Sequence, residues 1–119
     1  RQKLRRQLRA SPGVTVADTP ADADLIVESL QDSSEHLVAA TTSTSQISEM
    51  TLRARLRFRV RTPAGRELIV PTELAQTRDM SYSERSALAK QHEAALLFRS
   101  MHADLAMQVL RRLTALEPS

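Results

Sequence analysis

Residues 51–61, with the sequence TLRARLRFRVR, alternate strictly between apolar and basic or polar side chains. Successive side chains of a β-strand point to opposite sides, so this segment is predicted to be a strand with two different faces. Its basic face carries five arginines: Arg53, Arg55, Arg57, Arg59 and Arg61. A sheet with one apolar and one solvated face is usually antiparallel, with its apolar side covered by other elements. The five guanidiniums therefore need either acidic neighbours or an anionic partner.

The composition restricts the class of protein. With 119 residues and 41% hydrophobic side chains, residues 1–119 are expected to form one domain with a buried core. The absence of cysteine excludes disulfides, thiolate metal sites and a cysteine nucleophile. His36, His92 and His102 have no metal-ligand spacing and are expected to be solvated, and no phosphate-binding or hydrolase motif is present. We expect a protein that is not an enzyme, without metal or cofactor.

The charges are divided along the chain. Residues 14–50 carry seven acidic side chains and no Lys or Arg, whereas residues 51–66 carry six Arg and no acid. Arginine binds carboxylate and phosphate with a planar fork. Two interpretations remain open at this point. The acidic segment lies beside the arginine strand and pairs with it, or the arginine face binds an anionic partner.

Residues 67–76 are predicted to form the next strand. The intervening Pro63-Ala64-Gly65 fits a three-residue hairpin loop in which the glycine has a positive φ. Matching the apolar faces gives four expected pairs: Val60 with Leu68, Phe58 with Val70, Arg61 with Glu67 and Arg55 with Glu73. Pro71 indicates an edge strand.

In this register Arg57 and Arg59 have no acid directly opposite, because they face Pro71 and Ile69. Glu28 or Asp32 could still reach them from the acidic segment on the other side. These two arginines are therefore the candidates of the strand for binding an external anion.

The remaining pattern gives the fold class. Extended segments are predicted at 14–16, 23–30 and 36–42, with a break at 32–34, and helices at 1–10 and 83–116. The expected fold is α+β, a two-layer sandwich with two helices packed on one face of a mostly antiparallel sheet of about four strands. No capping residue precedes the first helix, which indicates that the sequence is an N-terminally truncated fragment.

The order of the motifs resembles a known family. An amphipathic helix is followed by PGV, ADLIV, SEMTLRARLRFRV, a PAG turn, and finally TRDMSYSERSALAKQHEAALLFRSMHADLAMQVLRRL. This order and spacing resemble the lipopolysaccharide-assembly lipoproteins of the LptE family of Gram-negative bacteria. The resemblance covers essentially the whole chain and is best in the last forty residues.

The resemblance implies a location and a role. Family members are held to the periplasmic side of the outer membrane by an acylated N-terminal cysteine, which this sequence lacks together with the first strand. They fold as a sheet with two helices packed on it. They plug the β-barrel protein LptD, help it to assemble and bind lipopolysaccharide. The family's lipid-contacting lysine maps onto Lys90, whereas a second basic position, in the loop before the central strand, is Ser43 or Thr44 here.

The predicted binding residues are therefore Lys90, Arg57 and Arg59, which would contact the phosphates of lipid A. The alternative is a nucleic-acid-binding module, which the sequence pI near 10.2 would also suit. Phe58 belongs to the apolar face, so the basic face offers no aromatic ring for base stacking, and we expect no nucleic-acid partner. A third interpretation, a structural plug whose charges serve docking to the barrel, overlaps with the first.

Overall fold

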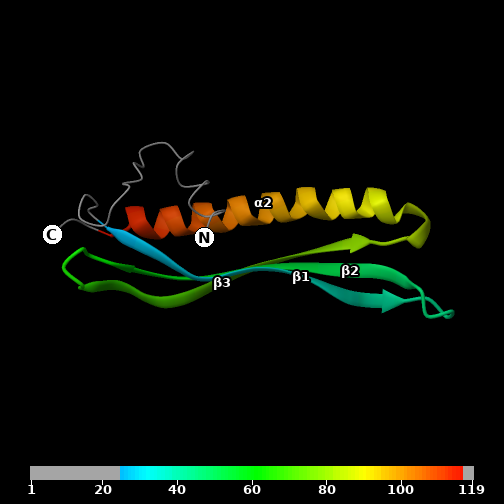
Figure 1. Ribbon diagram of the computed structural model, residues 1–119, viewed down its shortest axis with the longest axis horizontal. Coiled ribbons are helices and arrows are strands. Elements are labelled where there is room, and N and C mark those ends of the chain that lie inside the picture. The colour runs from blue at the N-terminus through cyan, green and yellow to red at the C-terminus, as the bar shows by residue number, and fades with distance from the viewer. Residues whose placement is uncertain (1–24, 117–119) are drawn as a thin grey trace.

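The computed structural model describes residues 25–116. They form three long strands and a helical segment, in the order β1 (Ile26–Thr41), β2 (Ile47–Arg61), β3 (Glu67–Ser81), the 3₁₀ turn η2 (Glu84–Ser86) and α2 (Ala87–Thr114). The strands make one antiparallel sheet in the order β1-β2-β3. Helix α2 lies along one face of this sheet for most of its length (Figure 1).

The predicted α+β class and antiparallel sheet are confirmed, but the details differ. Within the described residues there are one α-helix and three strands, rather than two helices and about four strands. The helix predicted at 1–10 and the strand predicted at 14–16 lie outside the described residues. The break predicted at 32–34 was wrong, because β1 runs through these positions as one strand.

The core lies between the apolar face of β2 and α2. Leu52, Leu56 and Phe58 are at most 3% exposed, as the alternation predicts. The helix contributes Phe98, Met101, Leu105 and Val109, which share one side at spacings of three and four. Apolar residues recur at three, four or seven along this helix from Leu88 onwards, which predicts that Leu88 joins them, but Leu88 is 80% exposed. Leu88 lies ten residues before Phe98. At 3.6 residues per turn this separation is about 80° short of three full turns, so the side chain of Leu88 points about 80° away from the core-facing side of the helix.

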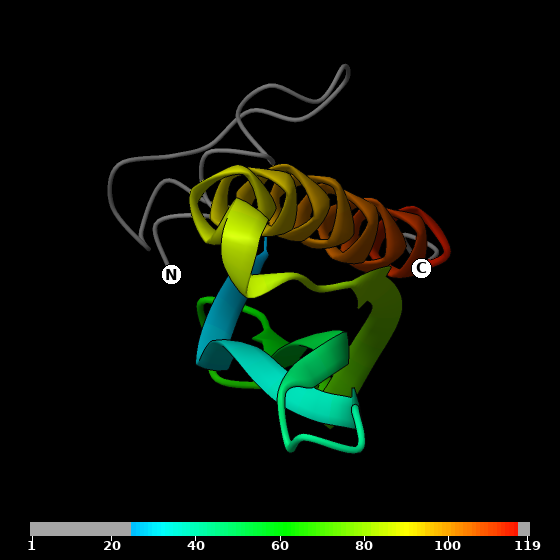
Figure 2. The same ribbon diagram turned by 90° about the vertical axis from the view of Figure 1, so that its right-hand side faces the viewer.

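The two hairpins that connect the strands use the same turn. In the second, the N–H of Gly65 donates to the carbonyl of Thr62, and Gly65 has φ +98°, which confirms the predicted loop. In the first hairpin, the N–H of Ser45 donates to the carbonyl of Thr42, and Ser45 has φ +64°. Figure 2 shows the sheet end-on, with α2 on one side of the curved strands.

The predicted register between β2 and β3 holds only beside the turn. Arg61 faces Glu67, but Val60 then faces Ile69 and Phe58 faces Thr72, because β3 contains two extra residues between these pairs. Pro71 lies in this irregular stretch, where its missing N–H breaks no ladder bond. As a result Val70, expected opposite Phe58, is 62% exposed.

A third irregularity changes which way β1 presents its side chains. Ser29 pairs with Phe58 and Gln31 with Arg57, so Leu30 is an extra residue in β1. Beyond this β-bulge the alternation is inverted, because one additional residue exchanges the two faces of a strand. The bulge allows Glu28 and Glu35, seven residues apart, to lie on the same face.

Candidate functional site

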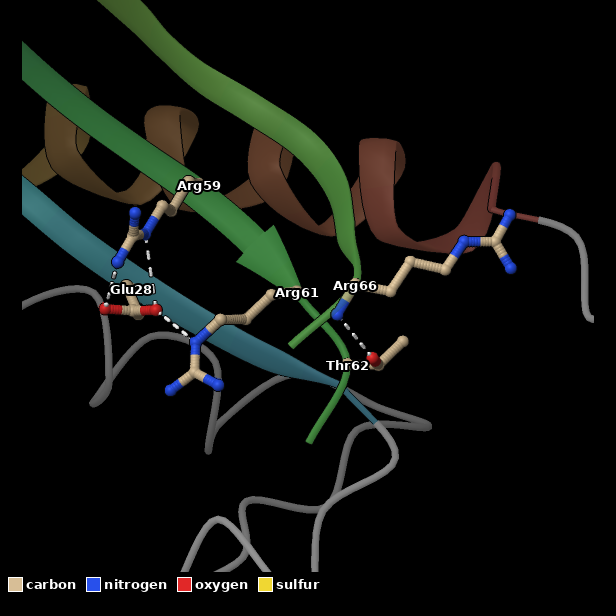
Figure 3. Close-up of polar contacts among 5 residues, drawn as sticks. All are labelled: Glu28, Arg59, Arg61, Thr62 and Arg66. Carbon is tan, nitrogen blue, oxygen red and sulfur yellow. Dashed lines mark hydrogen bonds and ion pairs between the residues drawn. The ribbon is translucent and has the colours of Figure 1, made fainter. Parts of the chain in front are cut away.

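The outer face of the sheet, opposite α2, carries the arginine row of β2. Near one end, Glu28 of β1 binds two of these arginines (Figure 3). Nη2 of Arg59 lies 3.2 Å from Oε2 of Glu28. Nε of Arg61 donates a hydrogen bond to Oε1 of the same carboxylate. One acid therefore holds two guanidiniums that lie two residues apart on β2.

Glu35 repeats this arrangement towards the other end of the row. Nη2 of Arg53 lies 2.9 Å from Oε2 of Glu35, and Nε of Arg55 lies 2.9 Å from Oε1. Glu73 of β3 approaches Arg55 at 3.9 Å, although its register partner is Arg57. The interpretation in which the acidic segment pairs with the arginine strand is therefore confirmed for four of the five arginines.

These contacts change the acidity of the two glutamates. The hydrogen bond from Arg61, followed by that from Arg59, lowers the pKa of Glu28 below its usual value. The hydrogen bond from Arg53 is the largest cause of the lowered pKa of Glu35. The same contact raises the pKa of Arg53, so both partners remain ionised. The four bound arginines are thus partly neutralised.

Arg57 lies in the middle of the row, between the two bound pairs. Its register neighbours are Gln31 on β1 and Glu73 on β3. Its side chain is exposed, and within residues 25–116 it makes no ion pair or hydrogen bond to another side chain. The prediction that no acid lies directly opposite Arg57 was wrong, because Glu73 rather than Pro71 is its register partner on β3, although the two side chains form no ion pair. Glu28 reaches Arg59 from β1, which the sequence left open.

The outer face is not a positive surface despite its five arginines. The register also places six acidic residues on this face: Glu28, Glu35, Glu49, Glu67, Glu73 and Asp79. The described part of the face therefore carries one more acid than base. A phosphate-rich ligand would meet alternating charges here rather than a cationic patch.

Lys90 lies at the start of α2, beside the end of β3. Its Nζ donates to Oγ of Ser81 at 2.9 Å and pairs with Oε2 of Glu93 at 3.1 Å. Its side chain is 22% exposed. Along β3, Ser81 is eight residues from Glu73, the register partner of Arg57, a separation of about 26 Å in an extended strand. The structure does not bring Lys90 and Arg57 into one site.

The inner face contains a polar cluster that the sequence did not reveal. Oγ of Ser34 is hydrogen-bonded to Nε2 of His102 at 2.8 Å, and Nδ1 of the same ring lies 3.5 Å from Oδ1 of Asp32. His102 and Asp32 are 7% and 12% exposed, so the expectation that this histidine is solvated was wrong. The only sequence signal was the alternation of polar residues at 32, 34 and 36.

The order Ser34–His102–Asp32 is that of a hydrolase triad. Here, however, the imidazole is covered by packing between β1 and α2, and it also lies beside the ring of Phe98, with 6.4 Å between centroids. The contacts connect a strand to the helix. We assign the cluster the structural role of fixing β1 against α2.

The described residues offer few other kinds of site. Between residues 25 and 116 no group of three or more His, Asp or Glu side chains is placed to hold a metal ion. No described helix combines the length and the apolar composition required to cross a membrane.

The fold is shared with several bacterial lipoproteins of known structure. The rare lipoprotein B of Shewanella oneidensis is 25% identical, with a TM-score of 0.75 over 96% of this chain and 83% of that one. An uncharacterized lipoprotein B of Nitrosomonas europaea is 22% identical, with a TM-score of 0.80 over 96% and 74%. A minor lipoprotein of Acinetobacter baumannii is 21% identical, with a TM-score of 0.75 over 98% and 88%. No curated protein matches the sequence.

These likenesses show that the chain has the fold of bacterial lipoproteins such as rare lipoprotein B. The model of the LptE family, described as lipopolysaccharide-assembly, matches residues 1–113. The chain belongs to this family, as the order of its motifs predicts. It is a lipoprotein of lipopolysaccharide transport and outer-membrane assembly.

Proposed function

We propose that this protein plugs the LptD β-barrel, helps it to assemble, and binds lipopolysaccharide on its way to the cell surface. The observation that carries the proposal is the family match over residues 1–113. The full-length protein would be attached by an N-terminal lipid to the periplasmic side of the outer membrane. It would act without catalysis, as one domain spanning residues 1–119.

Lys90 is the proposed lipopolysaccharide contact. An ammonium group has three donors, and Ser81 and Glu93 occupy two of them. The third can meet a lipid A phosphate, and the two existing bonds hold the group in position. Arg57 and Arg59 were predicted to bind the same ligand. That assignment remains a prediction for both, and Arg59 would have to share its guanidinium with Glu28.

The first prediction tests this contact. Lys90→Glu should weaken lipopolysaccharide binding, measured by titration calorimetry on the purified full-length protein. Its thermal stability should change little, because an exposed helical ion pair contributes about 0.3–0.5 kcal/mol. Arg85→Glu is the matched control, since Arg85 is exposed, lies five residues away and undergoes the same charge reversal. Equal lipopolysaccharide binding by the Lys90→Glu variant and the unaltered protein would remove Lys90 from the site.

The alternative of nucleic-acid binding loses its main support. The basic face that would track a phosphate backbone carries more acids than arginines in its described part. Phe58 is fully buried, so it cannot stack on a base. Duplex DNA should therefore bind to this protein no more tightly than it binds to other proteins of similar net charge.

A further inference from the structure

Helix α2 carries large apolar side chains on the side that faces away from the sheet. Leu96 and Met107 are 48% and 44% exposed. Each lies two residues from a buried core residue, Phe98 or Leu105, and two residues turn a helix by about 200°. Both side chains therefore point away from the sheet. Leu88, at the start of the helix, adds an 80% exposed side chain on the flank of this outward side.

Few charges interrupt the outward side. Over the stretch of α2 that these three apolar residues span, the exposed charged side chains are Glu93, Arg99 and Asp104. Glu93 is paired with Lys90, on the flank of the helix towards β3. Asp104 is paired with Arg78 of β3. Arg99 makes no ion pair within residues 25–116, so the outward side combines apolar area with an available guanidinium.

The two sides of the molecule also differ in net charge. The segment from η2 to the end of α2 carries five basic and three acidic side chains: Arg85, Lys90, Arg99, Arg111, Arg112, Glu84, Glu93 and Asp104. The outer face of the sheet carries six acids and five arginines. An anionic surface would therefore attract the helix side and not the outer face of the sheet. A second copy of the chain would bring the same positive side against itself, which disfavours a dimer through α2.

We propose that the outward side of α2 lies on the surface of a phospholipid bilayer with anionic headgroups. Leu88, Leu96 and Met107 enter the boundary between headgroups and acyl chains, and Arg99 meets the lipid phosphates. The helix lies in the plane of the membrane, since it is not apolar enough to cross it. The inference goes beyond the proposed function, because it requires neither lipopolysaccharide nor the barrel.

The experiment sediments the full-length chain, produced without a lipid on its N-terminus, with vesicles of phosphatidylethanolamine and phosphatidylglycerol. Leu96→Asp should reduce partitioning by about tenfold or more, because it replaces a buried apolar side chain by a charge of the same sign as the lipid. Arg99→Gln should reduce it about fivefold, the effect of one arginine near an anionic surface, and should change nothing with phosphatidylcholine vesicles.

The control is an apolar residue outside the helix. Val70 is 62% exposed on β3, so Val70→Asp makes a comparable change away from α2 and should bind vesicles like the unaltered protein. An equal loss of binding in the Val70→Asp and Leu96→Asp variants would overturn the inference. It would also be overturned if Leu96→Asp bound as well as the unaltered protein.

A fluorescence measurement locates the contact directly. Leu96→Trp introduces the only tryptophan of residues 1–119, and Val70→Trp does the same on the sheet. The emission of the Leu96→Trp variant should shift to shorter wavelength when the anionic vesicles are added, and that of Val70→Trp should not. A shift that required lipopolysaccharide in the vesicles would overturn the inference in favour of that lipid. A shift on raising the protein concentration without vesicles would overturn it in favour of a second copy.

Discussion

The two faces of β2 are built from alternate residues of the same strand, yet different forces act on them. On the inner face Leu52, Phe58 and Val60 are fully buried against the helix, so shape and apolar area determine which side chains fit. On the outer face four of the five arginines are paired with glutamates and remain partly exposed to water. The comparison teaches that stability depends mainly on the inner face, which leaves the outer face free to serve recognition.

The largest expected effect lies on the inner face. Phe58→Ala should lower the free energy of unfolding by about 3–5 kcal/mol, because it removes a fully buried ring and leaves a cavity. Arg57→Gln, one residue away on the other face, should change it by no more than about 0.5 kcal/mol. Urea denaturation of both variants measures the difference. Similar losses of unfolding free energy in the two variants would show that the outer face contributes to stability as much as the inner face does.

A smaller loss is expected from the polar cluster on the inner face. His102→Ala should cost about 1–3 kcal/mol, because it removes a buried imidazole that is hydrogen-bonded to Ser34 and lies beside the nearly buried carboxylate of Asp32. His92→Ala is the control, since His92 is an exposed histidine of the same helix and should be nearly neutral. Thermal unfolding distinguishes the two. If both variants unfolded alike, the cluster would contribute nothing to the attachment of β1.

The smallest expected effect on stability comes from the ion pairs of the outer face, and it depends on pH. The pKa values of Glu28 and Glu35 are lowered in the folded protein, so the stability that they contribute is fully present above their ordinary pKa of about 4.3. It is lost as the pH falls through the lowered folded values. A series of urea denaturations between pH 7 and pH 3 should show this loss, and it should be weaker in the variant Glu28→Gln/Glu35→Gln. An unchanged pH profile in that variant would show that the pairs do not contribute.

The sequence predicted the parts of the fold that depend on periodicity. The alternation of β2, the buried positions Phe98 to Val109 of the helix, and the glycine turn all follow from residue spacing. The pairing register does not, because β-bulges add residues without any mark in composition. Leu30 is an ordinary apolar residue within an extended run, and nothing in the sequence identifies it as unpaired.

Because the pairing register could not be predicted from the sequence, the contacts of the candidate site could not be predicted either. Opposite charges in adjacent segments suggested pairing, but only the register decides which acid meets which arginine. The sequence therefore placed Pro71 rather than Glu73 opposite Arg57, and it left open whether Glu28 reaches Arg59. It also missed His102, because contact between residues 34 and 102 depends on how the helix lies across the sheet. Long-range packing of this kind leaves no periodic trace.

The β-bulge at Leu30 has a consequence for comparing this protein with its relatives. In a regular strand two residues lie on the same side only when an even number of steps separates them, and the seven steps between Glu28 and Glu35 are odd. A relative whose strand lacks the extra residue would turn one of these acids towards its helix, even if its sequence there were otherwise the same. A gap of one residue at this point therefore exchanges inside and outside for the rest of the strand. Equivalent positions in the family are better matched by the side of the sheet they occupy than by counting along the chain.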